Sequence, residues 1–112
     1  MINLVYKASN IAKAEQATGK NLFDCIAALD KSVSFADLMF LIQAGGGTED
    51  DFDALFASGI ENMMRAILEG INNAGFLGEE NKLDVEALMK TVHEEVEKAG
   101  KTLPNSGEAT NQ

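Results

Sequence analysis

The chain has 112 residues, a length that suits a single domain with a modest core. Its apolar fraction of 46% is typical of a folded globular protein, whereas its formal net charge of −9 argues against binding to nucleic acid or to an acidic membrane surface. No apolar run reaches the roughly 18 residues of a membrane-spanning helix, and residues 1–7 lack the apolar stretch of a signal peptide. We therefore expect a cytoplasmic protein.

The first segment, residues 2–7, is rich in β-branched and aromatic side chains and alternates partly in polarity. This pattern predicts a short β-strand, or an extended arm that pairs only in an oligomer, because the rest of the chain is typical of helices and offers no second strand. Leu4 and Tyr6 are therefore candidate protein-contact residues.

Two short helices are expected next. Ser9 or Asn10 can cap a helix that runs to Ala17, and Gly19 stands where a left-handed C-terminal cap would lie. Asn21 can cap the second helix. The apolar residues that we expect to form its buried face are Leu22, Phe23, Ile26 and Leu29.

A nearly all-apolar helix is predicted over residues 35–44, with Ser34 as its cap and Asp37 completing an imperfect capping box. A helix that is apolar on every side is buried, either in its own core or against a partner. Met39 and Phe40 are therefore further candidate contact residues.

Two more helices follow this central one. Thr48 can cap a helix that Gly59 ends or bends, and residues 60–74 form another helix with one apolar face. Residues 75–78 are expected to form a turn that two apolar side chains anchor. The apolar stripe expected on the helix after Thr48 consists of Phe52, Leu55 and Phe56.

The last predicted helix, residues 85–99, begins after the cap Asp84 and ends at Gly100. Its apolar residues recur at three- and four-residue steps and form a narrow seam, which can dock on the domain or on a partner. The candidate contact residues on this seam are Val85, Leu88, Val92 and Val96.

Together these elements predict an all-α fold, a single small domain of five to six helices over residues 1–100, with a possible short N-terminal strand or extended arm. Residues 101–112 are mostly polar and cannot fill a core, so we expect them to form a disordered tail or linker.

The residues indicate no catalytic, cofactor or metal site. His93 and Glu97 lie one helical turn apart, but two ligands do not make a zinc site. Cys25 is the only cysteine, and its apolar neighbours predict a buried, inert thiol. Residues 17–21 resemble the end of a phosphate-binding loop, yet Ala14 stands where that loop needs its first glycine. We therefore expect a protein that is not an enzyme.

Glutamate, threonine, glycine, lysine and leucine follow one another at Glu15, Thr18, Gly19, Lys20 and Leu22. This segment is similar to the glutamate–x–x–threonine–glycine–lysine–x–leucine segment of siphophage tail assembly chaperones. The similarity continues through the helix over 35–44, which ends in Ala44-Gly45, and through the acidic stretch 48–56 to residue 76. It covers about residues 1–77.

The resemblance implies an all-helical, non-catalytic protein made in the host cytoplasm during phage infection. Such chaperones coat the aggregation-prone tape measure protein and recruit tail tube subunits, which displace the chaperone as the tube grows, so it is absent from the finished virion. They also self-associate. The chain would be the short form of a pair produced by a programmed −1 ribosomal frameshift, and residues 101–112 would lead into the extension of the longer form.

The composition indicates the same class of function without the resemblance. Met and Phe side chains pack adaptably and suit a groove for apolar helices, and a charge of −9 keeps such a complex soluble. The alternative is a small helical adaptor or regulatory protein with another protein partner. A third hypothesis, a small enzyme or metal protein, would depend on His93. We expect neither nucleic acid nor a membrane as a partner.

Overall fold

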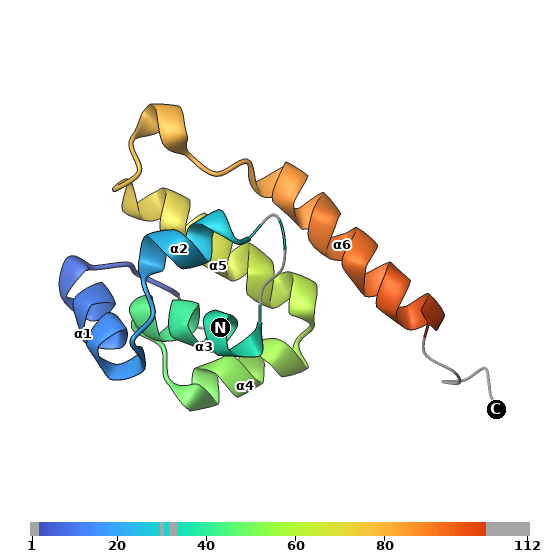
Figure 1. Cartoon of the computed structure of the whole chain (residues 1–112), viewed down its shortest axis with the longest axis horizontal. Helices are drawn as coiled ribbons and strands as arrows, with labels where there is room; N and C mark the ends of the chain where they lie inside the picture. The colour runs from blue at the N-terminus through green and yellow to red at the C-terminus, as the bar shows by residue number, and fades with distance from the viewer. Residues whose placement is uncertain (1–2, 30, 32–33, 103–112) are drawn as a thin grey trace.

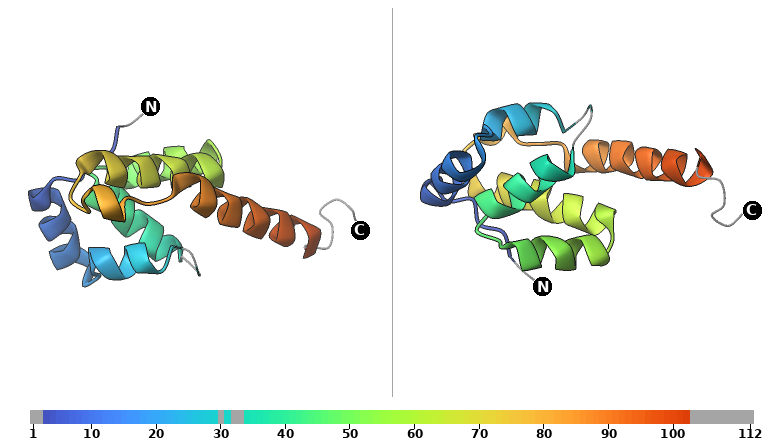
Figure 2. Two further views of the ribbon diagram at one scale, coloured as in Figure 1. Left: turned by 90° about the horizontal axis from the view of Figure 1, so that it is seen from above. Right: turned by 60° about the horizontal axis from the view of Figure 1, so that its bottom comes forward.

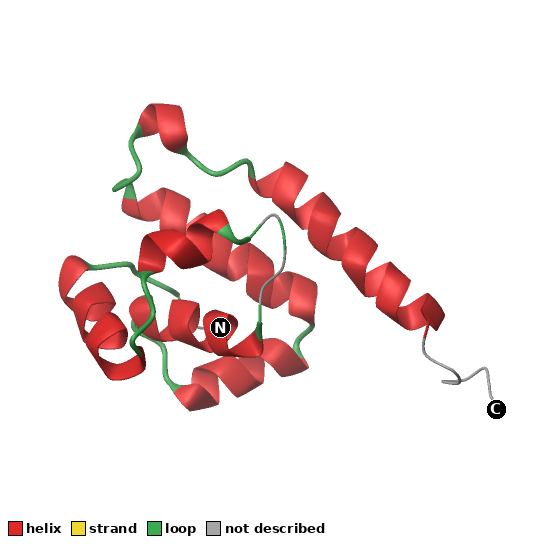
Figure 3. Cartoon of the chain, in the orientation of Figure 1, coloured by secondary structure: helices red, strands yellow, loops and turns green. Residues whose placement is uncertain are grey.

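The computed structural model describes residues 3–29, 31 and 34–102 (Figure 1). These residues form six α-helices and one short 3-10 helix, and no strand is found among them (Figure 3). The prediction of an all-α domain is therefore confirmed. The elements are α1 (Ala8–Thr18), α2 (Leu22–Ala27), α3 (Phe35–Ala44), α4 (Glu49–Ala57), α5 (Ile60–Ala74), η1 (Glu79–Asn81) and α6 (Val85–Thr102).

Side-chain caps start most of the helices at the predicted residues. The side chains of Asn21, Ser34 and Asp84 each accept a hydrogen bond from the backbone N–H three residues on. Thr48 does the same, and the carboxylate of Asp51 accepts the N–H of Thr48 in return at 2.8 Å, which completes a capping box. The sequence therefore located these helix starts correctly.

The start of α1 differs from the prediction. The helix begins at Ala8 after Lys7, which makes no side-chain cap, so neither Ser9 nor Asn10 is the cap. Its entry is set instead by Tyr6, whose side chain is buried in the core directly before the first turn. Tertiary packing overrides the local capping preference here.

The core lies between α3 and α5, which supply most of its fully buried side chains. Helix α3 packs against α1, α2 and α4, and α5 packs against α4 and α6 (Figures 1 and 2). The central burial predicted for residues 35–44 is confirmed. The side chains with almost no exposed surface are Phe40, Leu41, Ile42, Met63, Ile67, Leu68 and Ile71.

The N-terminal arm is extended but pairs within its own chain. The N–H of Val5 donates to the carbonyl oxygen of Gly45 at 2.9 Å, and the side chains of Leu4 and Tyr6 are buried. The expectation that this arm pairs only in an oligomer is therefore wrong. The arm fits because Gly45 and Gly70 have no side chain. A Cβ on either would lie 3.0 Å from an atom of Tyr6.

Helix α6 extends beyond the other helices along part of its length (Figure 2). It continues through Gly100 to Thr102, so the predicted end at Gly100 is wrong. Of the expected tail over 101–112, Lys101 and Thr102 are the last residues of this helix, and 103–112 lie outside the described residues. No helix in the described part of the chain is long and apolar enough to cross a membrane.

Candidate interaction surface

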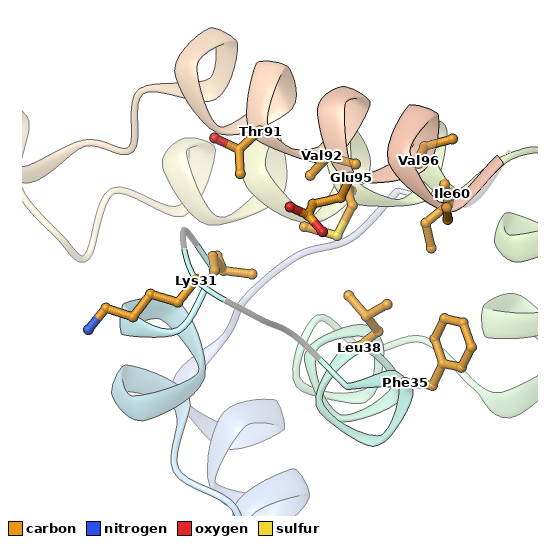
Figure 4. A pocket seen from close by; sticks show the side chains of 11 residues that line it. Lys31, Phe35, Leu38, Ile60, Thr91, Val92, Glu95 and Val96 are labelled. Carbon is orange, nitrogen blue, oxygen red and sulfur yellow. The ribbon is translucent and has the colours of Figure 1, made fainter. Parts of the chain in front are cut away.

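A groove of about 310 Å³ lies between α6 and the body of the domain. Val92 and Val96 form part of its α6 wall, and Figure 4 shows them across from Phe35 and Leu38 of α3. Most of its lining is apolar. The lining residues are Leu29, Lys31, Phe35, Leu38, Ile60, Met64, Thr91, Val92, Glu95, Val96 and Ala99.

Contacts near the start of α6 fix this wall of the groove. The side-chain amide of Asn72 on α5 donates to the carbonyl oxygen of Leu83 at 2.9 Å and accepts the N–H of the same residue at 2.8 Å. Arg65 forms an ion pair with Glu86 at 3.1 Å. Met89 is buried one turn further on. The helix is thus anchored at its start, whereas Val96 keeps 39% of its surface exposed.

An exposed aromatic pair lies beside the groove. The rings of Phe35 and Phe56 pack edge to face with centroids 5.6 Å apart, yet 61% and 49% of these residues are exposed. Of the apolar stripe predicted for this helix, only Leu55 is fully buried, and Phe56 points outward. Phe35 also lines the groove, so the pair and the groove form one apolar surface.

A second exposed pair, Phe23 and Phe76, joins α2 to the turn after α5. Its ring centroids are 6.4 Å apart, and Phe23 is 62% exposed. The prediction that Phe23 lies on a buried face is therefore wrong. The buried stripe of this segment is Leu22, Cys25 and Leu29, and a residue next to Leu22 points about 100° away from it on a helix.

The eight candidate contact residues have different environments. Leu4, Tyr6 and Phe40 are buried in the core of the chain itself, so they are not available as surface contacts. Val92 and Val96 both line the groove. The remaining three, each half-buried, are Met39, Val85 and Leu88.

Sequence reasoning missed Phe35 as a groove residue. Helix α3 is apolar on nearly every side, so no polar face indicates which of its side chains point outward. Only the approach of α6 from 50 residues later in the chain defines the groove, and no local pattern could have indicated it.

Residues 15–22 form the corner between α1 and α2. The Glu15 carboxylate accepts the N–H of Leu22 at 2.9 Å. The Thr18 hydroxyl donates to the carbonyl oxygen of Ala14 at 2.7 Å. Gly19 takes the left-handed conformation, with φ of 76°, that a non-glycine residue adopts at a cost. These residues therefore act as a structural corner and hold no phosphate-loop geometry.

The corner is tied to the core helix by an ion pair. The Lys20 ammonium lies 2.8 Å from the Asp37 carboxylate at the start of α3, and this hydrogen bond lowers the pKa of Asp37 below its ordinary value. Cys25 is buried nearby, as predicted, and burial raises the pKa of its thiol. A thiol held protonated is a poor nucleophile.

His93 lies between two carboxylates. Its Nδ1 is 3.0 Å from Glu61 of α5, and its Nε2 is 3.3 Å from Glu97 of α6. The hydrogen bond and the charge of Glu61 raise the pKa of His93, and the charge of Glu97 adds to this. Within the described ranges, no three His, Cys, Asp or Glu side chains come together as a metal site.

Comparisons with protein-family models, with curated proteins and with solved structures give no match. The function of the chain is therefore inferred from its groove, its exposed aromatic pairs and the segment around Glu15.

Proposed function

We propose that the chain is a non-catalytic tail assembly chaperone that binds apolar helices of a tape measure protein in the groove between α6 and the body. The observation that carries this proposal is the continuous apolar surface of the groove and the Phe35–Phe56 pair. The sequence similarity over residues 1–77 supports the choice of partner.

The shape of the groove suits the anchoring side chains of a helix. An amphipathic helix docks through apolar residues at i, i+3 or i+4 and i+7, which project from one face. A volume of about 310 Å³ is near the lower end for ligand pockets and accommodates a few such side chains. Met64 in the lining can adjust its shape to different anchors, which suits a client with a varied helical sequence.

The Phe35–Phe56 pair adds apolar contact area at the edge of the groove. Large exposed aromatic side chains are enriched in protein interfaces, where they bury much surface for little lost rotamer freedom. Phe35 and Phe56 already restrict each other by edge-to-face packing, so a partner that covers both has less to order.

The rest of the surface favours solubility of a complex. The chain carries a net charge of −9, and the first turn of α4 alone presents Glu49, Asp50 and Asp51. Such a surface keeps an otherwise aggregation-prone client dispersed by mutual repulsion. Recruitment of tail tube subunits, self-association, release before the virion is complete, and the frameshifted longer form come with the resemblance and are proposed with it.

Co-expression with the neighbouring tape measure gene tests the proposal. We expect the chain to keep the tape measure protein soluble and to co-purify with it. Val96→Asp places a charge in the groove wall and should abolish co-purification, whereas Glu94→Gln on an exposed face of the same helix should not. A tape measure protein that stays insoluble, or that binds both variants equally, would overturn the proposal and favour an adaptor with another partner.

Self-association has its own test. Light scattering of the purified chain should show oligomers that grow with concentration, and Phe23→Ser should reduce their size if the Phe23–Phe76 pair is the contact between copies. Val92→Asp tests the α6 seam in the same way. A monomer at every concentration would contradict self-association without bearing on client binding.

A further inference from the structure

The imidazole of His93 contacts carboxylates at both of its ring nitrogens. Nδ1 faces Oε2 of Glu61 on α5 at 3.0 Å, and Nε2 faces Oε2 of Glu97 on α6 at 3.3 Å. The first contact joins two helices, and the second lies within one helix. His93 is the only histidine of the chain, so its titration can be followed without ambiguity.

This geometry suits a protonated ring. A neutral imidazole carries one N–H, and an ionised carboxylate can only accept hydrogen bonds. In the neutral ring, one of the two contacts would therefore place a nitrogen lone pair against a negatively charged oxygen. Only the imidazolium donates to both carboxylates at once.

The position of His93 along α6 gives its protonation a mechanical consequence. Asn72 and Arg65 hold the start of the helix through Leu83 and Glu86. His93 is nearly two turns beyond Glu86 and reaches back to the first turn of α5, close to Ile60 of the groove. Val96, on the groove wall, follows one turn later. A contact at this point therefore controls how closely the outer part of α6 approaches the body.

We propose that protonation of His93 latches α6 onto α5 and so sets the width of the groove at Val96. Loss of the proton removes the charge attraction to both carboxylates and leaves a single N–H for two acceptors, which weakens the hold of Glu61 on the outer half of α6. That the latch regulates client binding rests on the proposed function. The latch itself needs no client and operates in the isolated chain.

The charges around His93 favour the latched state. From α5, Glu61 faces the ring, and the nearest cation on that helix, Arg65, is already engaged by Glu86 at 3.1 Å and Glu69 at 3.6 Å. From α6, the ionisable residues within about one turn of His93 are Lys90, Glu94, Glu95 and Glu97. The raised pKa of His93 agrees with this surplus of acids. A raised pKa means that the latch is complete at low pH and is lost as the pH rises through the folded-state pKa.

Spin labels can report the latch without any client. Cysteines at Ala57 on α4 and Lys98 on α6, both exposed, are labelled in the full chain with Cys25→Ala, and the distance distribution is measured below and above the midpoint of the His93 titration. The midpoint comes from the proton NMR signal of the single imidazole. We expect a short, narrow distribution below the midpoint and a longer, broader one above it.

Matched variants separate the latch from general charge effects. Glu61→Gln should lower the His93 midpoint and remove the pH response of the distance. Glu97→Gln should lower the midpoint and keep the response, because the contact between the helices remains. Glu94→Gln should leave the His93 midpoint above those of Glu61→Gln and Glu97→Gln, and it should keep the pH response of the spin-label distance. If Glu61→Gln proves unfolded by circular dichroism, His93→Gln takes its place and should likewise abolish the response.

A distance that stays constant while His93 titrates would overturn the latch, and so would a Glu61→Gln variant that behaves like Glu94→Gln. Because no tape measure protein is present, this result leaves the proposed client binding standing. Conversely, a failed co-purification does not alter the distance measurement. The two proposals can therefore fail separately.

Discussion

The hydroxyl of Tyr6 donates a hydrogen bond to the carbonyl oxygen of Leu41 at 2.8 Å, in the interior of the domain. This bond joins the N-terminal arm to the C-terminal turn of α3, and the same Leu41 carbonyl oxygen also accepts the N–H of Gly45 at 3.2 Å. Burial raises the pKa of the Tyr6 hydroxyl far above its ordinary value, so it remains a donor over the accessible pH range. The arm is thereby part of the core and not a free extension.

Removal of that hydroxyl should weaken the domain measurably. Tyr6→Phe keeps the ring but leaves the Leu41 carbonyl without this donor, at an expected cost of about 0.5–1.5 kcal/mol in the free energy of unfolding. Tyr6→Ala also empties a core site and should cost about 3–5 kcal/mol. Urea denaturation measures both. Val5→Ala, at the exposed neighbour, is the control and should change stability by less than about 0.5 kcal/mol.

The close packing of the N-terminal arm against Gly70 leads to a second prediction. In most helices Gly→Ala stabilises by roughly 1 kcal/mol, but at Gly70 the new Cβ would lie 3.0 Å from the Tyr6 ring and 3.2 Å from the backbone oxygen of Leu4. Backbone cannot move aside cheaply, so we expect Gly70→Ala to lower the melting temperature.

The matched control is Gly100→Ala, where a Cβ meets nothing within 4 Å. This substitution on α6 should increase helical content, since alanine has the higher helix propensity. Opposite signs at the two glycines are the expected result. A stabilising effect at Gly70 would mean that the arm does not occupy this slot in solution.

Local chemistry in the sequence located most of the helices, because capping residues act within one turn. Ser34 and Thr48 start their helices as predicted, and the capping bonds are all short-range. The direction in which each apolar side chain points was harder to predict from the sequence. Phe23 and Phe56 belong to helices too short to bury more than a narrow stripe, and apolar character alone could not show that they point outward.

The candidate site depended on contacts that span the chain. The groove forms because α6 packs against α5 and faces α3 across the pocket. The N-terminal arm is buried because Gly45 and Gly70 have no side chain in its path. Neither relationship leaves a periodic signal in the sequence. The seam residues Val92 and Val96 could be predicted, since their spacing marks one face of α6, but the partner surface across from them could not.

The side-chain amide of Asn72 should hold the start of α6 against α5. Asn72→Ala removes both hydrogen bonds to Leu83, each worth roughly 1 kcal/mol, and frees the segment that leads into α6. We expect faster amide hydrogen exchange in α6 with little change in α3, because the core contacts remain. Asn73→Ala, at the exposed neighbouring position, is the control and should leave the exchange of α6 unchanged.

The Lys20–Asp37 pair predicts how the stability of the domain depends on pH. The Lys20 hydrogen bond lowers the folded-state pKa of Asp37 below its ordinary value of 3.8. The pair therefore stabilises the fold fully above that value, and the contribution is lost as the pH falls through the lower folded-state pKa. Melting temperatures measured on the acid side should decline less steeply in Asp37→Asn than in the native chain.

Asp53→Asn, on the exposed surface of α4, provides the comparison for this acid-side measurement. It removes the same formal charge from the chain, so it reproduces any change caused by net charge alone. Because Lys20 and Asp37 are both partly exposed, we expect the effect of the pair to be modest and to shrink in high salt. Equal acid profiles for Asp37→Asn and Asp53→Asn would show that the corner between α1 and α2 is held by the Glu15 and Thr18 hydrogen bonds without help from the ion pair.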